Sequence, residues 1–314
     1  MSKVTIIGAG NVGATCANVL AHRDIVKEVV MLDIPNAEGM VVGKALDMWQ
    51  QAPIDNYSTY LRGTVNYEDT ANSDVVVITA GVPRKPGMSR DDLISINANI
   101  VKSVTENIMK YSSNPIIIVV SNPLDVMTYA AHKASGLDAT KVFGMAGILD
   151  TARYRAFIAE ALQVSPKDIQ ALLMGGHGDT MVPLPRYTTV AGIPVTELMD
   201  TDKLNAIVER TKVGGGELVK LIGTSAWYAP GAAAAQMVEA IVKDEDRVFP
   251  CCIKLEGQYG IDNVYVGVPV KLGKTGIKQV IEVKLNADEM QLLNDSAAAV
   301  KVVMDVYDNL TAQA

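Results

Sequence analysis

The sequence predicts an α/β protein: a doubly wound parallel sheet followed by an α+β domain. Short runs rich in Val and Ile occupy residues 4–7, 28–32, 75–79 and 116–120, and longer helical patterns separate them. Continuous apolar runs are typical of parallel strands buried on both faces. The alternation of strands and helices predicts a parallel sheet with right-handed crossovers.

The pattern changes near residue 145, so we divide the chain into residues 1–145 and 146–314. The first part is expected to hold helices over residues 11–22, 38–50 and 90–112. The second part groups its strands after helices, which favours an α+β arrangement. Its expected elements are a helix over 149–163, a strand over 169–174, helices over 202–222 and 231–243, strands near 248–254, 262–270 and 277–283, and a helix over 286–309. The helix over 231–243 is a candidate to pack back on the first domain.

The composition excludes several classes of function. With 49% hydrophobic residues, 20% charged residues and a net charge of −7, the chain is typical of a globular protein that does not bind nucleic acid. No apolar run reaches the ~18 residues of a membrane span, and the first residues lack a secretory signal, so we expect a cytoplasmic protein. Cys16, Cys251 and Cys252 have neither disulfide nor metal-ligand spacing, so no metal site is expected.

A glycine motif, G-x-G-x-x-G, follows the first strand and opens the first helix. The first glycine allows a tight turn, the second lets a pyrophosphate approach the backbone, and the third lets helix and strand pack closely. The helix N-terminus offers free N–H groups to phosphates. The motif therefore predicts a Rossmann-type dinucleotide site. Its residues are Gly8, Gly10, Asn11, Val12 and Gly13.

Asp33 ends the second strand, twenty residues after Gly13. A carboxylate at this position accepts hydrogen bonds from ribose hydroxyls and repels a 2′-phosphate, which favours NAD over NADP. The alternative is a structural glycine turn with a surface aspartate.

Of the three histidines, only His177 is a candidate for catalysis. His22 lies among charged residues at a helix end and is expected to be a solvated surface residue, and His132 lies in a helical stretch and is expected to be structural. His177 follows an expected strand and stands between two glycines, which leave its imidazole sterically open. An imidazole in such a position can exchange protons near neutral pH.

Asp150 and Arg153 are three residues apart on an expected helix, so they share a face. An aspartate beside an imidazole would fix its tautomer and raise its pKa. A guanidinium grips a carboxylate with two hydrogen bonds. The spacing is equally consistent with a surface salt bridge.

Two further segments carry polar candidates. Asn122 stands at the carboxyl end of the strand over 116–120, where ligands bind in such sheets. Capping of the next helix by Ser121 or Asn122 is the alternative. The stretch PRKPGMSR, residues 83–90, is broken by prolines and a glycine, so its Arg84 and Arg90 are expected on a loop that holds an anion.

These motifs occur in order along the whole chain: GAGNVG, AGVPRKPGMSRDDL, VSNPLDVMTY, GILDTARYR and GGHGDTMVP. The chain resembles the lactate/malate dehydrogenase superfamily, and within it the lactate-dehydrogenase-like malate dehydrogenases of bacteria. The resemblance implies reversible, NAD-dependent oxidation of (S)-malate to oxaloacetate, a reaction of the tricarboxylic acid cycle. It also implies a homo-oligomer, either a dimer or a tetramer.

The resemblance assigns roles to individual residues. It implies that His177 is the acid/base, that Asp150 is its partner, and that Arg153 binds the C1 carboxylate. Arg90 would close over the site and polarise the C2 carbonyl. The implied cofactor contacts after the glycine turn are Asn97, Val120, Asn122 and Ser225, and Asn122 would also contact substrate.

Arg84 is the residue expected to select the substrate. The family's lactate dehydrogenases usually have glutamine at this position, and its malate dehydrogenases have arginine. A second carboxylate is costly to bury without a partner, and a guanidinium supplies one. The alternative is a solvated loop charge.

Three other functions compete with this interpretation. A lactate or broader 2-hydroxyacid dehydrogenase is opposed by Arg84, and a non-catalytic NAD-binding module needs none of the catalytic residues. The stretch LGKTG, residues 272–276, superficially suggests a nucleotidase P-loop, but position 268 is Val rather than the required glycine. The helical stretch 37–48 is either a subunit contact or packs on the sheet.

Overall fold

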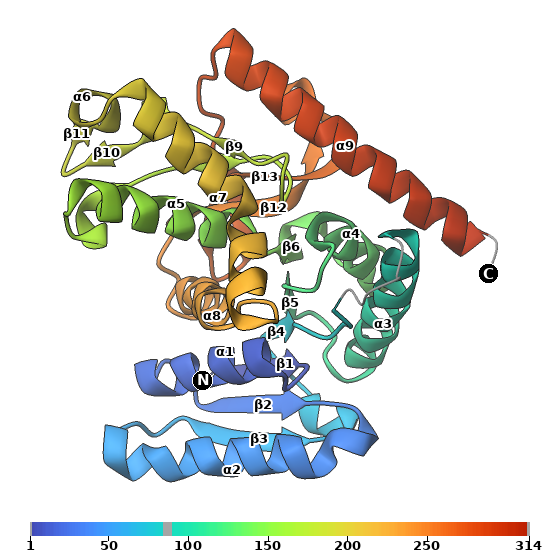
Figure 1. Cartoon of the computed structure of the whole chain (residues 1–314). Helices are drawn as coiled ribbons and strands as arrows, with labels where there is room; N and C mark the ends of the chain where they lie inside the picture. Colours follow the sequence, from blue (N-terminus) through green and yellow to red (C-terminus); the bar gives the residue numbers. More distant parts are fainter. Residues whose placement is uncertain (1, 84–89, 313–314) are drawn as a thin grey trace.

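The computed structural model describes residues 2–83 and 90–312, and it confirms the predicted α/β fold (Figure 1). Within these residues the main sheet has nine strands, in the order β14-β13-β12-β6-β5-β4-β1-β2-β3. The parallel strands are β1 (Lys3–Ile7), β2 (Glu28–Leu32), β3 (Tyr60–Thr64), β4 (Val75–Ile78), β5 (Ile116–Val119) and β6 (Val142–Gly144). Their order is that of a doubly wound nucleotide-binding sheet, which binds ligands at the carboxyl ends of its strands.

The strands predicted from continuous apolar runs are the inner ones. β4 and β5 are buried along their whole length. The sequence analysis missed β3 and β6. β3 is an edge strand in which exposed Tyr60 and Arg62 flank buried Leu61, and β6 has only three residues. Neither therefore forms a continuous apolar run of useful length.

Most helices cover the two faces of the main sheet near the predicted positions, whereas the short helix α6 (Val195–Leu198), which was not predicted, lies away from it (Figure 1). The other helices are α1 (Asn11–Arg23), α2 (Glu38–Asp55), α3 (Arg90–Tyr111), α4 (Leu124–Ser135), α5 (Gly147–Leu162), α7 (Thr201–Ile222), α8 (Tyr228–Val242) and α9 (Ala287–Ala312). The predicted return of α8 to the first domain is confirmed. A Cβ on Gly231 of α8 would lie 2.7 Å from the Cβ of Thr15 in α1, so only glycine permits this approach.

The long strands of the second half continue the main sheet beyond β6. β12 (Arg247–Glu256), β13 (Asp262–Gly273) and β14 (Gly276–Val280) form an antiparallel ladder, and β12 joins β6 through the pair Cys252 and Gly144. The turn between β13 and β14 contains the LGKTG stretch, so a hairpin stands where a P-loop would need a helix.

The single strand predicted over 169–174 is wrong. The chain forms β7 (Ile169–Gln170) and β8 (Leu173–Met174), which pair with different partners. β7 pairs with β10 (Thr189–Val190), which also pairs with β11 (Ile193–Pro194). β8 pairs with β9 (Val182–Pro183). The run reads as one strand in the sequence because each of the two short strands contributes buried apolar side chains.

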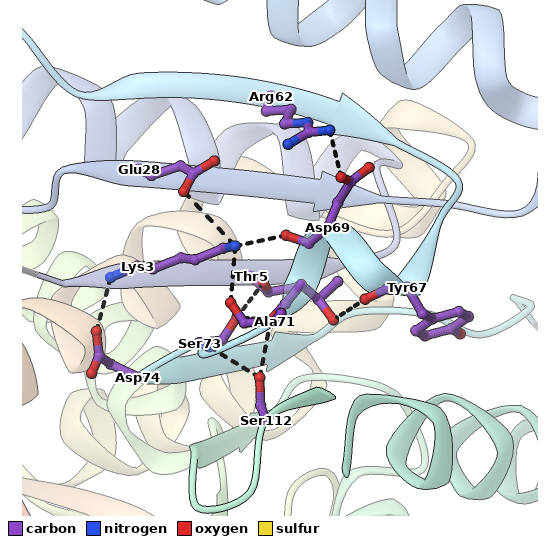
Figure 2. A network of polar contacts seen from close by, with 11 residues as sticks. Lys3, Thr5, Glu28, Arg62, Tyr67, Asp69, Ala71, Ser73, Asp74 and Ser112 are labelled. Atoms are coloured by element: carbon purple, nitrogen blue, oxygen red, sulfur yellow. Dashed lines mark hydrogen bonds and ion pairs between the residues drawn. The ribbon is translucent and has the colours of Figure 1, made fainter. Parts of the chain in front are cut away.

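Polar contacts connect strands and turns at the amino-terminal ends of the parallel strands (Figure 2). Lys3 Nζ donates to the carbonyl oxygens of Asp69 and Ala71, at 2.7 and 3.0 Å. Ser112 Oγ accepts the N–H of Ser73 at 3.0 Å, just before β4. These side chains tie strands and turns together at the edge opposite the carboxyl ends.

In the part of the chain that is described, no helix is long and apolar enough to cross a membrane.

Candidate active site

The glycine motif forms the tight turn between β1 and α1 that the sequence predicts. Gly8 has φ +98°, a conformation that favours glycine. A Cβ on Gly13 would lie 1.9 Å from the carbonyl oxygen of Gly8, so helix and turn touch backbone to backbone. Around a Cβ built on Gly10, by contrast, no atom of the described residues other than Gly10 and its two neighbours in the chain lies within 4 Å. This open space in front of the α1 N-terminus is the cradle that a pyrophosphate requires.

Asp33 stands beside this turn, as predicted from its place after β2. Its Oδ2 accepts the N–H of Ala9 at 2.7 Å, and its Oδ1 accepts the N–H of Ile34 at 2.8 Å. Lys44 of α2 donates to the carbonyl of Ala9 at 2.8 Å. The carboxylate is therefore fixed next to the glycine turn.

A cavity of about 430 Å³ extends from the glycine turn along the carboxyl ends of β4 and β5. Among the predicted cofactor residues, those that line it are Gly10, Asn11, Val12, Asn97, Val120, Asn122 and Ser225. The sequence analysis missed Thr79 and Trp227, which also line it. The signal for Thr79 was its place directly after β4. The cradle and the elongated cavity fit an NAD molecule.

Asn97 shapes this cavity through the main chain. Its Oδ1 accepts the N–H of Val82 at 2.8 Å, and its Nδ2 donates to the carbonyl of Asn122 at 2.7 Å. Asn122 itself is exposed and precedes a cis bond to Pro123. The capping alternative for Ser121 or Asn122 is wrong, since α4 has Pro123 at its N-cap and no side-chain cap among the described residues.

The structure brings together the three residues that the sequence placed on two separate motifs. Nδ1 of His177 lies 2.8 Å from Oδ2 of Asp150, and Nη1 of Arg153 lies 3.2 Å from its Oδ1. The side chain of His177 is 19% exposed, that of Asp150 is 3% exposed, and that of Arg153 is 14% exposed. The alternative of a surface salt bridge is therefore wrong, because Asp150 is buried and bridges the two bases.

This environment favours the protonated imidazole. Burial acts to lower the pKa of His177, but the charge and hydrogen bond of Asp150, with the charge of Asp125, outweigh it and raise the pKa above its ordinary value. Since a carboxylate can only accept, Nδ1 donates to Asp150. Nε2 is then the ring nitrogen left to exchange a proton with a ligand.

His177 and Arg153 line a second cavity of about 730 Å³. Its other wall is α7, including Gly215 and Gly216. The sequence analysis missed this wall. The sequence feature that could have indicated it is the run of three glycines, residues 214–216, in the middle of a helix. Each glycine there lowers the stability of the helix by roughly 1 kcal/mol relative to alanine. A Cβ on Gly214 would touch the Arg153 side chain at 3.4 Å, so α7 packs closely against the guanidinium stem.

The remaining candidates are the two other histidines and the two loop arginines. His22 binds the carbonyl of Asn18 and the carboxylate of Asp55 at the surface, and half-buried His132 binds the carbonyl of Leu137 and the hydroxyl of Tyr265. His22 is therefore a surface residue and His132 is structural, as predicted. Arg84 lies outside the described residues, and for Arg90 only the main chain is described, as the first residue of α3.

A dinucleotide cradle on a doubly wound sheet, next to a histidine held by a buried carboxylate, defines the class of nucleotide-dependent dehydrogenases. More specifically, the chain belongs to the lactate/malate dehydrogenase family. Residues 2–144 match that family's NAD binding domain, and residues 148–310 match its alpha/beta C-terminal domain.

Relatives named malate dehydrogenase match nearly the whole chain. That of Cytophaga hutchinsonii is 69% identical over 99% of this chain and 100% of its own length. That of Salinibacter ruber is 59% identical, with 98% of each chain covered. A solved structure of the Salinibacter ruber malate dehydrogenase has a TM-score of 0.95 and 56% identity, with 99% of each chain covered. A lactate dehydrogenase from Cryptosporidium parvum, solved with lactic acid and NAD, has a TM-score of 0.93 and 38% identity over 98% of each chain.

Proposed function

We propose that this protein is an NAD-dependent malate dehydrogenase that interconverts (S)-malate and oxaloacetate. The observation that carries the proposal is the pairing of His177 with buried Asp150 at the wall of a cavity that Arg153 also lines. This arrangement supplies a proton donor and a carboxylate receptor side by side. The high identity to malate dehydrogenases supports the choice of substrate.

The mechanism follows from what each side chain can do. Arg153 grips the C1 carboxylate of the substrate with its planar fork. NAD, when bound, accepts the hydride from malate or, in its reduced form, supplies it to oxaloacetate. In the reducing direction, protonated His177 donates from Nε2 to the oxygen at C2, and Asp150 stabilises the imidazolium throughout. In malate oxidation, neutral His177 takes the hydroxyl proton.

His177→Asn tests this role directly. We expect kcat to fall by a factor of about 10²–10⁴, because the amide cannot exchange the proton. NADH binding, followed by fluorescence, should stay unchanged, since His177 does not line the cofactor cavity. Near wild-type turnover by a folded variant would contradict the mechanism.

We further propose that Arg84 pairs with the distal carboxylate of the substrate and that Arg90 polarises its carbonyl. Pyruvate lacks the distal carboxylate and would leave a buried guanidinium without a partner. The test is kcat/KM with NADH for oxaloacetate and for pyruvate. We expect a preference for oxaloacetate on the order of 10³ or more, because the penalty falls on a charged group.

Arg84→Gln should shift the preference towards pyruvate, and Arg247→Gln, at an exposed arginine outside both cavities, is the matched control. A preference of the wild type for pyruvate would favour the lactate dehydrogenase alternative. No turnover of either 2-keto acid would favour a non-catalytic module.

The division into residues 1–145 and 146–314, the cytoplasmic location and the homo-oligomeric state stay predictions. The helical stretch 37–48, now part of α2, has a buried face and an exposed apolar face. The exposed apolar residues of α2 are Met40, Val42, Leu46 and Ile54. They support a subunit contact, which analytical ultracentrifugation would test by resolving monomer, dimer and tetramer.

A further inference from the structure

The loop that carries His177 is bound by a different element at each of three consecutive residues. Gly175 exchanges two backbone hydrogen bonds of 2.9 Å with Gly267 of β13. The N–H of Gly176 donates to Oγ of Ser296 in α9 at 2.8 Å. The N–H of His177 donates to Oδ2 of Asp125 in α4 at 3.0 Å. The main chain of the histidine is thus held independently of its ring, which binds Asp150.

The packing around Gly176 is tight. A Cβ on Gly176 would lie 2.9 Å from Cγ2 of Val300 and 3.3 Å from Oδ2 of Asp125. Gly175 has φ +87°, which favours glycine. Because α4 and α9 each bind one N–H group of the loop, we expect a change in either side chain to reach His177.

Asp125 is an unusual residue to find in such a place. It is buried, and burial raises the pKa of its carboxyl despite the opposing effects of Cys252 and His177. Its Oδ1 has no hydrogen-bond partner among the described residues, an arrangement that normally weakens a fold. Its Oδ2 accepts the N–H of His177, so this buried carboxyl acts directly on the candidate proton donor. Asp125 also lies three residues after Asn122, which lines the cofactor cavity.

We propose that Asp125 is a positioning residue for the reaction, which holds the main chain of His177 and, with Ser296, sets where the imidazole meets the substrate. The inference rests on the proposed dehydrogenase function. Proton transfer requires the donor within roughly 2.6–3.2 Å of its acceptor. A displacement of about 1 Å can lower a rate by a factor of 10². The loss falls on the transition state, because Arg153 still holds the ground state.

The experiment compares Asp125→Ala with Asp125→Asn. Asp125→Ala removes the acceptor of the His177 N–H, and we expect kcat for oxaloacetate reduction to fall by about 10–100-fold. The KM for oxaloacetate and the Kd for NADH should stay within roughly two-fold. Asp125→Asn keeps an oxygen that accepts the same N–H, so it should recover most of kcat. Wild-type kcat in Asp125→Ala, or an Asp125→Asn as slow as Asp125→Ala, would overturn the inference.

Ser296→Ala provides a second test with a matched control. Ser112→Ala removes the same kind of buried bond, a serine Oγ that accepts a backbone N–H, at the opposite edge of the sheet (Figure 2). We expect only Ser296→Ala to lower kcat, although both variants lower the unfolding temperature. Equal losses of kcat would indicate general destabilisation and contradict the inference. The comparison of Ser296→Ala with Ser112→Ala tests the inference even if Asp125→Ala does not fold.

The wild type is measured first, which separates the two proposals. A wild type without turnover of oxaloacetate would overturn the proposed function and this inference together. An active wild type with unaffected Asp125 and Ser296 variants would overturn the inference alone.

Discussion

Nδ1 of His177 lies 2.8 Å from Oδ2 of Asp150, although the two residues are 27 positions apart and stand on different elements. The imidazole lies in the loop after β8, and the carboxylate lies in the first turn of α5. The contact fixes the ring in one tautomer and stabilises its charged form. The same carboxylate also binds Arg153, so the proposed proton donor and the proposed substrate receptor share one anchor.

The pH dependence of the two reaction directions should be opposite. Because the pKa of His177 is raised above 6.5, oxaloacetate reduction should be constant at low pH and fall as pH rises through that pKa. Malate oxidation should rise over the same range, since it needs the neutral ring. Protonated His177 also stabilises the fold below pH ~6.5, and this contribution is lost as pH rises through the pKa of the folded state.

Asp150→Asn should move both profiles to lower pH and reduce kcat by about 10²–10⁴, because the ring loses its charge partner and its fixed tautomer. Initial rates measured in both directions between pH 5 and pH 10 give the two profiles. Profiles that stay at the wild-type pH would show that Asp150 does not set the pKa of His177.

Arg153→Lys should weaken substrate binding, because a lysine keeps the charge but loses the planar fork. We expect kcat/KM for oxaloacetate to fall by roughly 10–100-fold, the equivalent of one charged hydrogen bond. Arg155→Lys is the control: it lies on the same helix, binds the carbonyl of Pro166 and does not line the cavity. Equal effects of the two substitutions on kcat/KM would contradict the assignment.

Asp33→Asn should relax the preference for NADH over NADPH. The amide oxygen can still accept the N–H of Ala9, so the turn should survive, while the charge that repels a 2′-phosphate is gone. We expect the ratio of kcat/KM for NADPH to that for NADH to rise by about 10–100-fold. Asp55→Asn, at a surface aspartate paired with His22, should leave the ratio unchanged. An unchanged ratio in Asp33→Asn would mean that another group selects the cofactor.

Gly13→Ala should impair NADH binding, because the new Cβ would lie 1.9 Å from the carbonyl oxygen of Gly8. Helix α1 must then move away from the turn that holds the phosphates. We expect the Kd for NADH to rise at least ~10-fold and stability to fall by roughly 1–3 kcal/mol, as for overpacked sites. Gly39→Ala has open space around its Cβ among the described residues of α2, and it should keep wild-type affinity. Fluorescence titration and thermal unfolding compare the two variants.

The features predicted correctly from the sequence are those that short stretches determine. The inner strands follow from continuous apolar runs, and the glycine turn follows from spacings that backbone sterics require. Asp33 was found because its carboxylate follows a strand at a fixed distance from that turn. In each case the physical constraint acts within one strand–turn–helix unit, so it leaves a readable pattern.

Other features were missed because their cause lies in distant packing. The resemblance named Asn97 as a cofactor contact, but no local pattern indicates that its amide binds the main chains of Val82 and Asn122. Gly214 and Gly215 lie beside the side chain of Arg153, a contact with another helix that the glycine run alone does not indicate. The apolar run over 169–174 divides into two strands because each half finds a different partner.

By itself, the sequence determined the class of fold, the dinucleotide turn and the candidate chemistry of His177, Asp150 and Arg153, because strand burial, glycine sterics and side-chain chemistry are local properties. Only the tertiary structure decided that Asp150 bridges the two bases, that β12 extends the first sheet through β6, and that Asp125 and Ser296 hold the histidine loop. These contacts join residues far apart in the chain. They depend on how helices and strands pack, which the order of residues in one segment does not reveal.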